Sequence, residues 1–160
     1  MRKADRGLRI AGVAIVLGAL TLSTPRAEEP PPPFTLETYR GQVGFLAEML
    51  EKKYGVTSVP EAKDKIIAIQ TADGRLVPLV ENIRGRAFRR DDRLRNPEVE
   101  LLVRRYAGSP AVQVIRVYEI APDGKYEIDY WCDICAIAMY ELKDCECCQG
   151  EIALRRTKVK

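Results

Sequence analysis

Residues 66–80 read IIAIQTADGRLVPLV, and this stretch indicates the fold class. Two apolar runs flank Asp73-Gly74, a dipeptide that supplies the positive backbone angles of a tight hairpin turn. Pro78 has no backbone donor, so the second arm is expected at a sheet edge or a bulge. The stretch therefore predicts a β-hairpin over residues 66–80.

Further strands are expected on both sides of this hairpin. Alternation predicts a first strand over residues 39–47, followed by a short helix over 48–54 that Gly55 ends. Strands are also predicted over residues 99–105, 111–119 and 125–131, the last after a turn at Asp123-Gly124. Residues 84–95 carry six arginines and few large apolar side chains, which indicates a solvated loop or one helical turn.

These elements predict a mainly β protein, with a small OB-like five-stranded barrel, one short helix and a C-terminal zinc-ribbon-like hairpin. A closed barrel is favoured because closure leaves fewer unpaired sheet edges. The strand order over residues 39–120, with Gly41 and Val43 in the first strand, resembles an OB-fold. The resemblance implies an oligonucleotide, an oligosaccharide or a protein as ligand on the face of strands two and three. A β-domain without a ligand is the alternative.

All five cysteines lie between positions 132 and 148, in two C-x-x-C pairs separated by nine residues. Two such pairs bring four thiolates together at the spacing that suits a tetrahedral ion. The candidate ligands are Cys132, Cys135, Cys145 and Cys148, with Cys147 as an alternative ligand or a free thiol. Gln149-Gly150 offers a flexible turn after the second pair, and residues 136–142 and 151–155 are the expected flanking strands. We expect a structural Zn²⁺ here, because four cysteine ligands leave no open position for catalysis.

Other chemistry stays open for the same cysteines. An exported protein meets an oxidising compartment, where two disulfides and one free thiol would form unless a metal binds first. A reactive redox site and an iron or copper centre are further alternatives, whereas a thioredoxin-like site is disfavoured because no βαβ pattern surrounds Cys132 and Cys135. The nearby acids Asp133, Asp144 and Glu146 are expected to raise the thiol pKa values and so disfavour an activated nucleophile.

The C-terminal stretch YWCDICAIAMYELKDCECCQGEIALR, behind the DGRLVPLV hairpin, supports a second resemblance. It is similar to a group of uncharacterised exported bacterial proteins that share a terminal CDIC…CECC signature. The resemblance rests on Cys132, Cys135, Cys145, Cys147 and Cys148, and it implies export without implying an activity.

The N-terminus indicates how the chain is targeted. Basic residues precede the apolar run Ile10–Leu22, and small residues follow it, as in a secretory signal peptide. Thirteen apolar residues are short for a membrane span, so no permanent span is expected after cleavage. The expected parts are a signal peptide (1–27), a proline-rich linker (28–35), an OB-like β-domain (36–122) and a cysteine-rich segment (123–160).

Composition limits the function classes. The 160 residues include no histidine, which excludes Ser-His-Asp triads, Cys-His pairs and histidine-ligated zinc. Residues 28–160 hold 21 basic and 22 acidic residues, so net charge gives no case for nucleic acid. We expect a periplasmic, cell-envelope or secreted protein that acts as a non-catalytic binding or assembly module, with an unknown protein or glycan partner. The alternative is an envelope thiol-redox or metal-handling protein that uses the cluster from Cys132 to Cys148.

Overall fold

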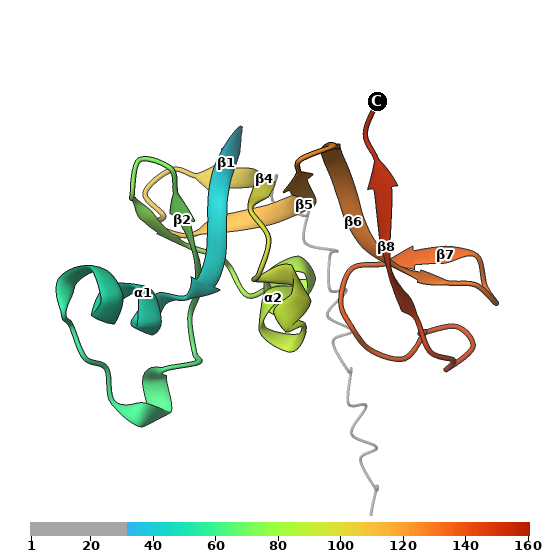
Figure 1. Cartoon of the computed structure of the whole chain (residues 1–160), viewed down its shortest axis with the longest axis horizontal. Helices are drawn as coiled ribbons and strands as arrows, with labels where there is room; N and C mark the ends of the chain where they lie inside the picture. Colours follow the sequence, from blue (N-terminus) through green and yellow to red (C-terminus); the bar gives the residue numbers. More distant parts are fainter. Residues whose placement is uncertain (1–31) are drawn as a thin grey trace, which may run out of the picture. The chain divides into compact units, whose positions relative to one another are not determined.

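A computed structural model describes residues 32–160, in which eight strands form one sheet accompanied by two helices (Figure 1). The expected signal peptide and the first half of the expected linker, residues 28–31, lie outside the described residues. The strands are β1 (Phe34–Phe45), β2 (Ile67–Thr71), β3 (Leu76–Pro78), β4 (Val99–Tyr106), β5 (Val112–Ala121), β6 (Gly124–Cys132), β7 (Ile137–Met139) and β8 (Ala153–Lys158). The helices are α1 (Leu46–Tyr54) and α2 (Ile83–Arg90), with 3₁₀ turns η1 (Pro60–Ala62) and η2 (Asp92–Leu94).

The sheet has the order β3-β2-β1-β4-β5-β6-β7, and β8 pairs with β6. The mainly β class is confirmed, whereas the closed five-stranded barrel is wrong in both strand number and closure. Closure fails because β3 is only three residues long and its chain meets β5 at a single parallel bridge, Leu79–Val112. The strands β6, β7 and β8 extend the same sheet beyond β5, so the C-terminal strands are not a separate hairpin.

Gly41 lets β1 pair with two different strands. Residues 34–41 of β1 pair with β4, and residues 41–45 pair with β2, so Gly41 belongs to both ladders. A Cβ atom at this position would lie 1.9 Å from the carbonyl oxygen of Gln70, which excludes any side chain. The bare backbone at Gly41 therefore allows β2 and β4 to meet at the same point of β1.

The helix α1 follows β1 without a loop and ends at Gly55, in a left-handed conformation with φ of 69°. Glycine adopts this angle at little cost, so the predicted helix end is confirmed. The predicted helix over 48–54 begins two residues later than the observed one.

The helix α2 replaces the loop or single turn expected over residues 84–95, and that expectation is wrong. The side chain of Asn82 caps the helix by accepting the Gly85 N–H at 2.9 Å. Phe88 is fully buried, and a Cβ atom on Gly85 would lie 2.1 Å from the Val80 carbonyl oxygen. Burial of one apolar face thus outweighs the charged composition of the segment.

One hydrophobic core extends from β1 to the cysteine-rich region. It includes Tyr39 and Val43 of β1, Phe88 of α2, and Cys132 and Cys145. Residues 32–160 form one compact unit. The expected boundary at residues 122 and 123 falls in the turn between β5 and β6. Within residues 32–160, no helix has the length and hydropathy needed to cross a membrane.

Candidate metal centre

The first cysteine pair is held at the end of β6. Cys132 is the last residue of that strand and is fully buried, and its Sγ lies 3.5 Å from the backbone N–H of Cys135. The chain then turns at Ala136, whose φ is 53° and whose N–H donates to the Cys132 carbonyl at 2.8 Å. A left-handed alanine is unusual and reflects the tight turn that the pair requires.

The second pair repeats this geometry in the loop between β7 and β8. Cys145 is fully buried, and Gln149 takes the place of Ala136, with φ of 58° and its N–H donating to the Cys145 carbonyl at 2.9 Å. A turn is present at Gln149-Gly150 as expected, and Gln149 is the residue that adopts the left-handed conformation. Gly150 instead allows close packing, because a Cβ atom there would lie 3.3 Å from both Cys148 Sγ and Ile134 Cδ1.

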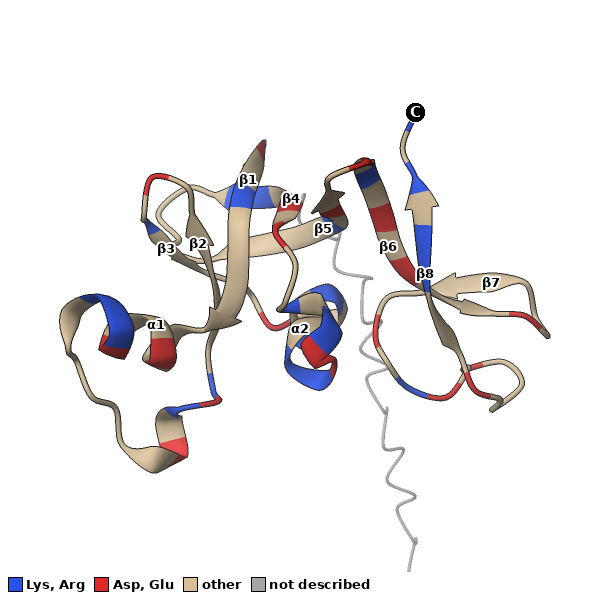
Figure 2. Ribbon diagram, in the orientation of Figure 1, with Lys and Arg blue, Asp and Glu red and all other residues tan. Residues whose placement is uncertain are grey.

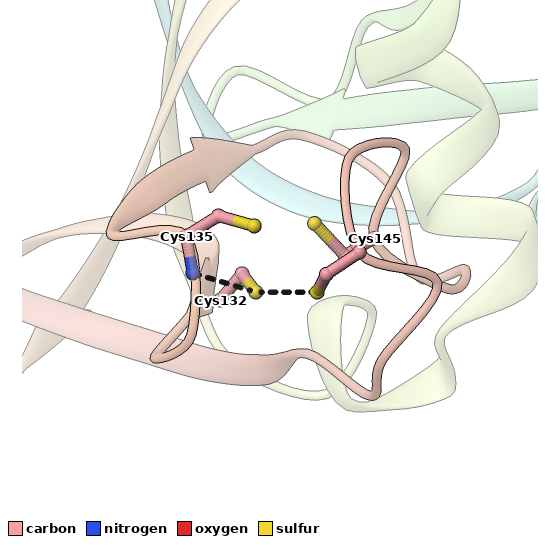
Figure 3. Close-up of side chains that lie close together, drawn as sticks. Cys132, Cys135 and Cys145 are labelled. Atoms are coloured by element: carbon pink, nitrogen blue, oxygen red, sulfur yellow. Dashed lines mark hydrogen bonds between the residues drawn. The ribbon is translucent and has the colours of Figure 1, made fainter.

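The two turns bring four sulfur atoms together. The Sγ atoms of the expected ligands all lie within 4.8 Å of one another, and the side chains of the three labelled cysteines point toward one another in Figure 3. Cys132 Sγ and Cys148 Sγ are 3.5 Å apart. A tetrahedral ion with bonds near 2.3 Å separates its sulfur ligands by about 3.8 Å. The four cysteines could therefore hold a metal ion with small side-chain adjustments.

The position of Cys147 separates it from these four. All five cysteines are free thiols, and Cys147 is the exposed one. Its backbone N–H lowers the pKa of Cys145, and its thiol raises the pKa of Cys135. Cys147 thus supports the site with its backbone and leaves its side chain accessible.

The pKa values of Cys132, Cys135 and Cys145 depend on backbone donors, burial and the neighbouring thiols rather than on the nearby acids. Backbone N–H groups of Cys148 and Cys147 lower the pKa of Cys145 to about 7. At Cys132 the N–H of Cys135 lowers the pKa, but burial and the neighbouring thiols outweigh it and the net shift is upward. The thiols of Cys147 and Cys148 raise the pKa of Cys135. The expectation that acids would raise all the thiol pKa values is wrong for Cys145, because backbone donors favour its thiolate.

Glu141 connects this loop to α2, and sequence reasoning missed it. Its side chain is fully buried, with Oε2 2.6 Å from Arg86 Nη2 and Oε1 2.9 Å from Arg90 Nε. The sequence did contain a signal for it. Glu141 lies two positions after the buried Met139, and side chains two positions apart in an extended chain lie on the same side. The ion pairs hold the chain between the two cysteine pairs against α2.

The arginine-rich segment 84–95 carries six guanidinium groups, the side chains that commonly bind phosphate or acidic partners. It forms most of α2 and η2, where basic residues gather in Figure 2. Each of its six guanidinium groups contacts a group of the protein itself. The partners are the Tyr140 ring for Arg84, Glu141 for Arg86 and Arg90, Glu81 for Arg89, Asp91 for Arg93, and the Phe88 carbonyl for Arg95. The segment therefore serves the packing of this fold.

Comparisons with protein-family models, curated proteins and solved structures return no match for this chain. The resemblance to exported proteins with a CDIC…CECC signature stays a prediction.

Proposed function

We propose that this chain is an exported, non-catalytic binding or assembly module whose C-terminal segment is stabilised by a structural Zn²⁺ ion. The observation that carries the proposal is the convergence of two matching C-x-x-C turns, whose four sulfurs lie within 4.8 Å of one another. Four cysteine ligands favour Zn²⁺ or iron among common metals, and they close the coordination sphere. A closed site suits a structural role, since catalysis needs an open position.

The buried position of the site also supports a structural role. Cys132 and Cys145 belong to the same core as Tyr130 and Met139, so an ion bound by them would fix the loop against the sheet. Metal binding to such sites contributes on the order of 10 kcal/mol in small zinc peptides. That value is comparable with the net stability of a whole domain.

An OB-like relationship of the first five strands is part of the proposal. The order β3-β2-β1-β4-β5 supports it, together with the helix α2 between β3 and β4 and the bridge from Leu79 to Val112. Export is supported by the basic and apolar pattern of residues 1–27. A periplasmic, cell-envelope or secreted location follows from this part of the proposal.

Native mass spectrometry and elemental analysis of the exported protein test the metal. One Zn²⁺ per chain is expected, and Cys148→Ser should lose it while Cys147→Ser keeps it. Stoichiometric iron would replace zinc in the proposal, and a metal-free protein with two disulfides would overturn the structural metal site.

A second candidate function is thiol-redox or metal handling, which the exposure of Cys147 favours. An accessible thiol beside the cluster could take over a ligand position while the ion moves to an acceptor. This function predicts that a chelator removes the metal within minutes and that Cys147→Ser slows the transfer at least tenfold. Metal that stays bound for hours in both proteins contradicts it.

A further inference from the structure

A pocket of about 300 Å³ opens on the outer face of β1 and β2, beside α1. The pocket is hollowed at Gly44 of β1, which pairs with Ala68 of β2. Neither strand places a large side chain at this position. The Met49 side chain of α1 covers one end, with its Cε 3.1 Å from the position of a Cβ atom on Gly44. Small residues under a helix thus produce the hollow.

Polar side chains line the open end of this pocket. Gln42 and Gln70 are direct partners across β1 and β2, so their amide groups lie side by side on the outer face. Asn96 adds a third amide from the segment before β4. Within residues 32–160, the side-chain hydrogen bonds around this pocket belong to Arg95 and involve none of these amides. Three amides that offer both donors and acceptors suit a ligand rich in hydroxyl groups.

Two cations and one acid set the charge of the pocket. Lys52 and Glu48 come from α1, and Arg95 comes from the segment after η2. Arg95 is fixed, because its Nη1 donates to the Phe88 carbonyl and its guanidinium lies 4.9 Å from the centre of the Phe45 ring. Its Nε and Nη2 stay available to a carboxylate or another anion. The pocket therefore carries one net positive charge, and the rest of its polar lining is neutral.

The aromatic content of the pocket argues against a nucleobase. Phe45 is the one aromatic ring among the described lining residues, and Arg95 already stacks over it. Single-stranded nucleic acids are bound on free aromatic faces, which this pocket does not offer. We propose that the pocket binds a saccharide that carries an anionic group, with the amides on its hydroxyls and with Arg95 and Lys52 on its charge. This inference rests on the proposed binding function and names its ligand class. It places the ligand on β1 and β2 beside α1, so the pocket includes a residue of the second strand but none of the third.

Titration of ¹⁵N-labelled mature protein with a galacturonic acid trimer tests the proposal, with the neutral galactose trimer and a sulfated disaccharide as matched ligands. The side-chain amide signals of Gln42 and Gln70 should shift on binding. The variant Q42A/Q70A should weaken the affinity about tenfold, and Lys52→Gln should remove most of the preference for the charged trimer. Lys63→Gln changes an exposed lysine outside the pocket and should leave the affinity unchanged.

The outcomes separate this proposal from the metal centre. Preference for the sulfated sugar over the uronate would keep the proposal and identify the anionic group. Unchanged affinity in Q42A/Q70A would overturn it, as would the absence of saccharide binding at about 5 mM, or tighter binding of an oligonucleotide at the same residues. Metal content is measured in the same samples, because the pocket and the cysteines come from different elements. A protein that holds zinc but binds no saccharide refutes only this inference, and a metal-free protein that binds the trimer refutes only the zinc site.

Discussion

Ala136 and Gln149 each follow the second cysteine of a pair and adopt left-handed backbone angles. This conformation costs a residue with a Cβ atom about 1 kcal/mol relative to glycine. We expect Ala136→Gly to raise the free energy of unfolding of the metal-loaded protein by about 0.5–1 kcal/mol, measured by denaturant titration. Ala138→Gly in β7 is the matched control and should lower stability, because strand glycine costs entropy. Loss of stability in both variants would contradict the strain at Ala136.

Asp91 links the stability of the fold to pH. Its buried carboxylate accepts hydrogen bonds from the Tyr130 hydroxyl at 2.7 Å and from Arg93 at 2.7 and 2.8 Å. Burial raises the pKa of Asp91, but the hydrogen bonds from Arg93 and Tyr130 outweigh it and the pKa is lowered. The Asp91 carboxylate is therefore protonated more readily in the unfolded chain than in the folded protein. Its contribution to stability is complete above the ordinary aspartate pKa of about 4, and it is lost as the pH falls through the lower pKa of the folded protein.

The lowered pKa of Asp91 can be tested by substitution, with the adjacent Asp92 as the control. Asp91→Asn should lower the free energy of unfolding by about 1–3 kcal/mol at pH 7 and by clearly less at pH 3. Asp92→Asn, at an exposed position, should change it by less than about 0.5 kcal/mol. Denaturant titrations between pH 3 and 7 provide the measurement, and an equal loss from Asp91→Asn at both ends would contradict the linkage.

At the scale of elements, Glu141 joins α2 to the loop that carries the cysteines. Its carboxylate is fully buried while both arginine partners are about half exposed, so removing its charge leaves the arginines able to regain water. We expect Glu141→Gln to lower the free energy of unfolding by about 1–3 kcal/mol. Glu127→Gln removes a more exposed pair with Arg116 and should cost less than about 0.5 kcal/mol. Both variants are measured by thermal and denaturant unfolding. If Glu141→Gln and Glu127→Gln lower the free energy of unfolding equally, Glu141 does not hold the two elements together.

Sequence reasoning at this scale succeeded where the signal is local. Asp73-Gly74 and Gly55 specify a turn and a helix end from their own backbone preferences, and both predictions hold. The helix α2 was missed because its stability depends on the burial of Phe88 against distant strands. The strand β1 begins at Phe34, earlier than predicted, since its first half is fixed by pairing with β4. Such long-range pairing leaves no mark in the strand's own residues.

The same distinction applies to the candidate metal centre. The cysteine spacing correctly predicted that four candidate ligands lie in one cluster, because each C-x-x-C turn is a local structure. The contact between α2 and the cysteine loop could not be predicted from the sequence. The two segments lie about 50 positions apart and come together only in the folded protein. The open sheet could not be foreseen either, since it depends on how short β3 becomes.

At the scale of the whole molecule, metal removal should affect the two ends of the sheet differently. The strand pairings β1–β2, β1–β4 and β4–β5 involve no cysteine, whereas the segment from 132 to 152 contains little regular structure besides β7. Hydrogen exchange after chelation should therefore rise at least about tenfold in residues 132–152, with β1 and β4 still protected. Cys147→Ser should behave like the unchanged protein. Loss of protection throughout residues 32–160 would show that the ion stabilises the entire fold.

The pairing of β1 with β4 also bears on when the chain can fold. Partners such as Phe34 and Tyr106, or Gly41 and Val99, lie about 60 or more positions apart, so the sheet forms only after a long loop has closed. Contacts of this kind slow folding, because chain entropy is lost before the strands gain their hydrogen bonds. For a chain that crosses a membrane through an export channel, as we propose, slow closure keeps residues 34–40 of β1 unpaired during passage.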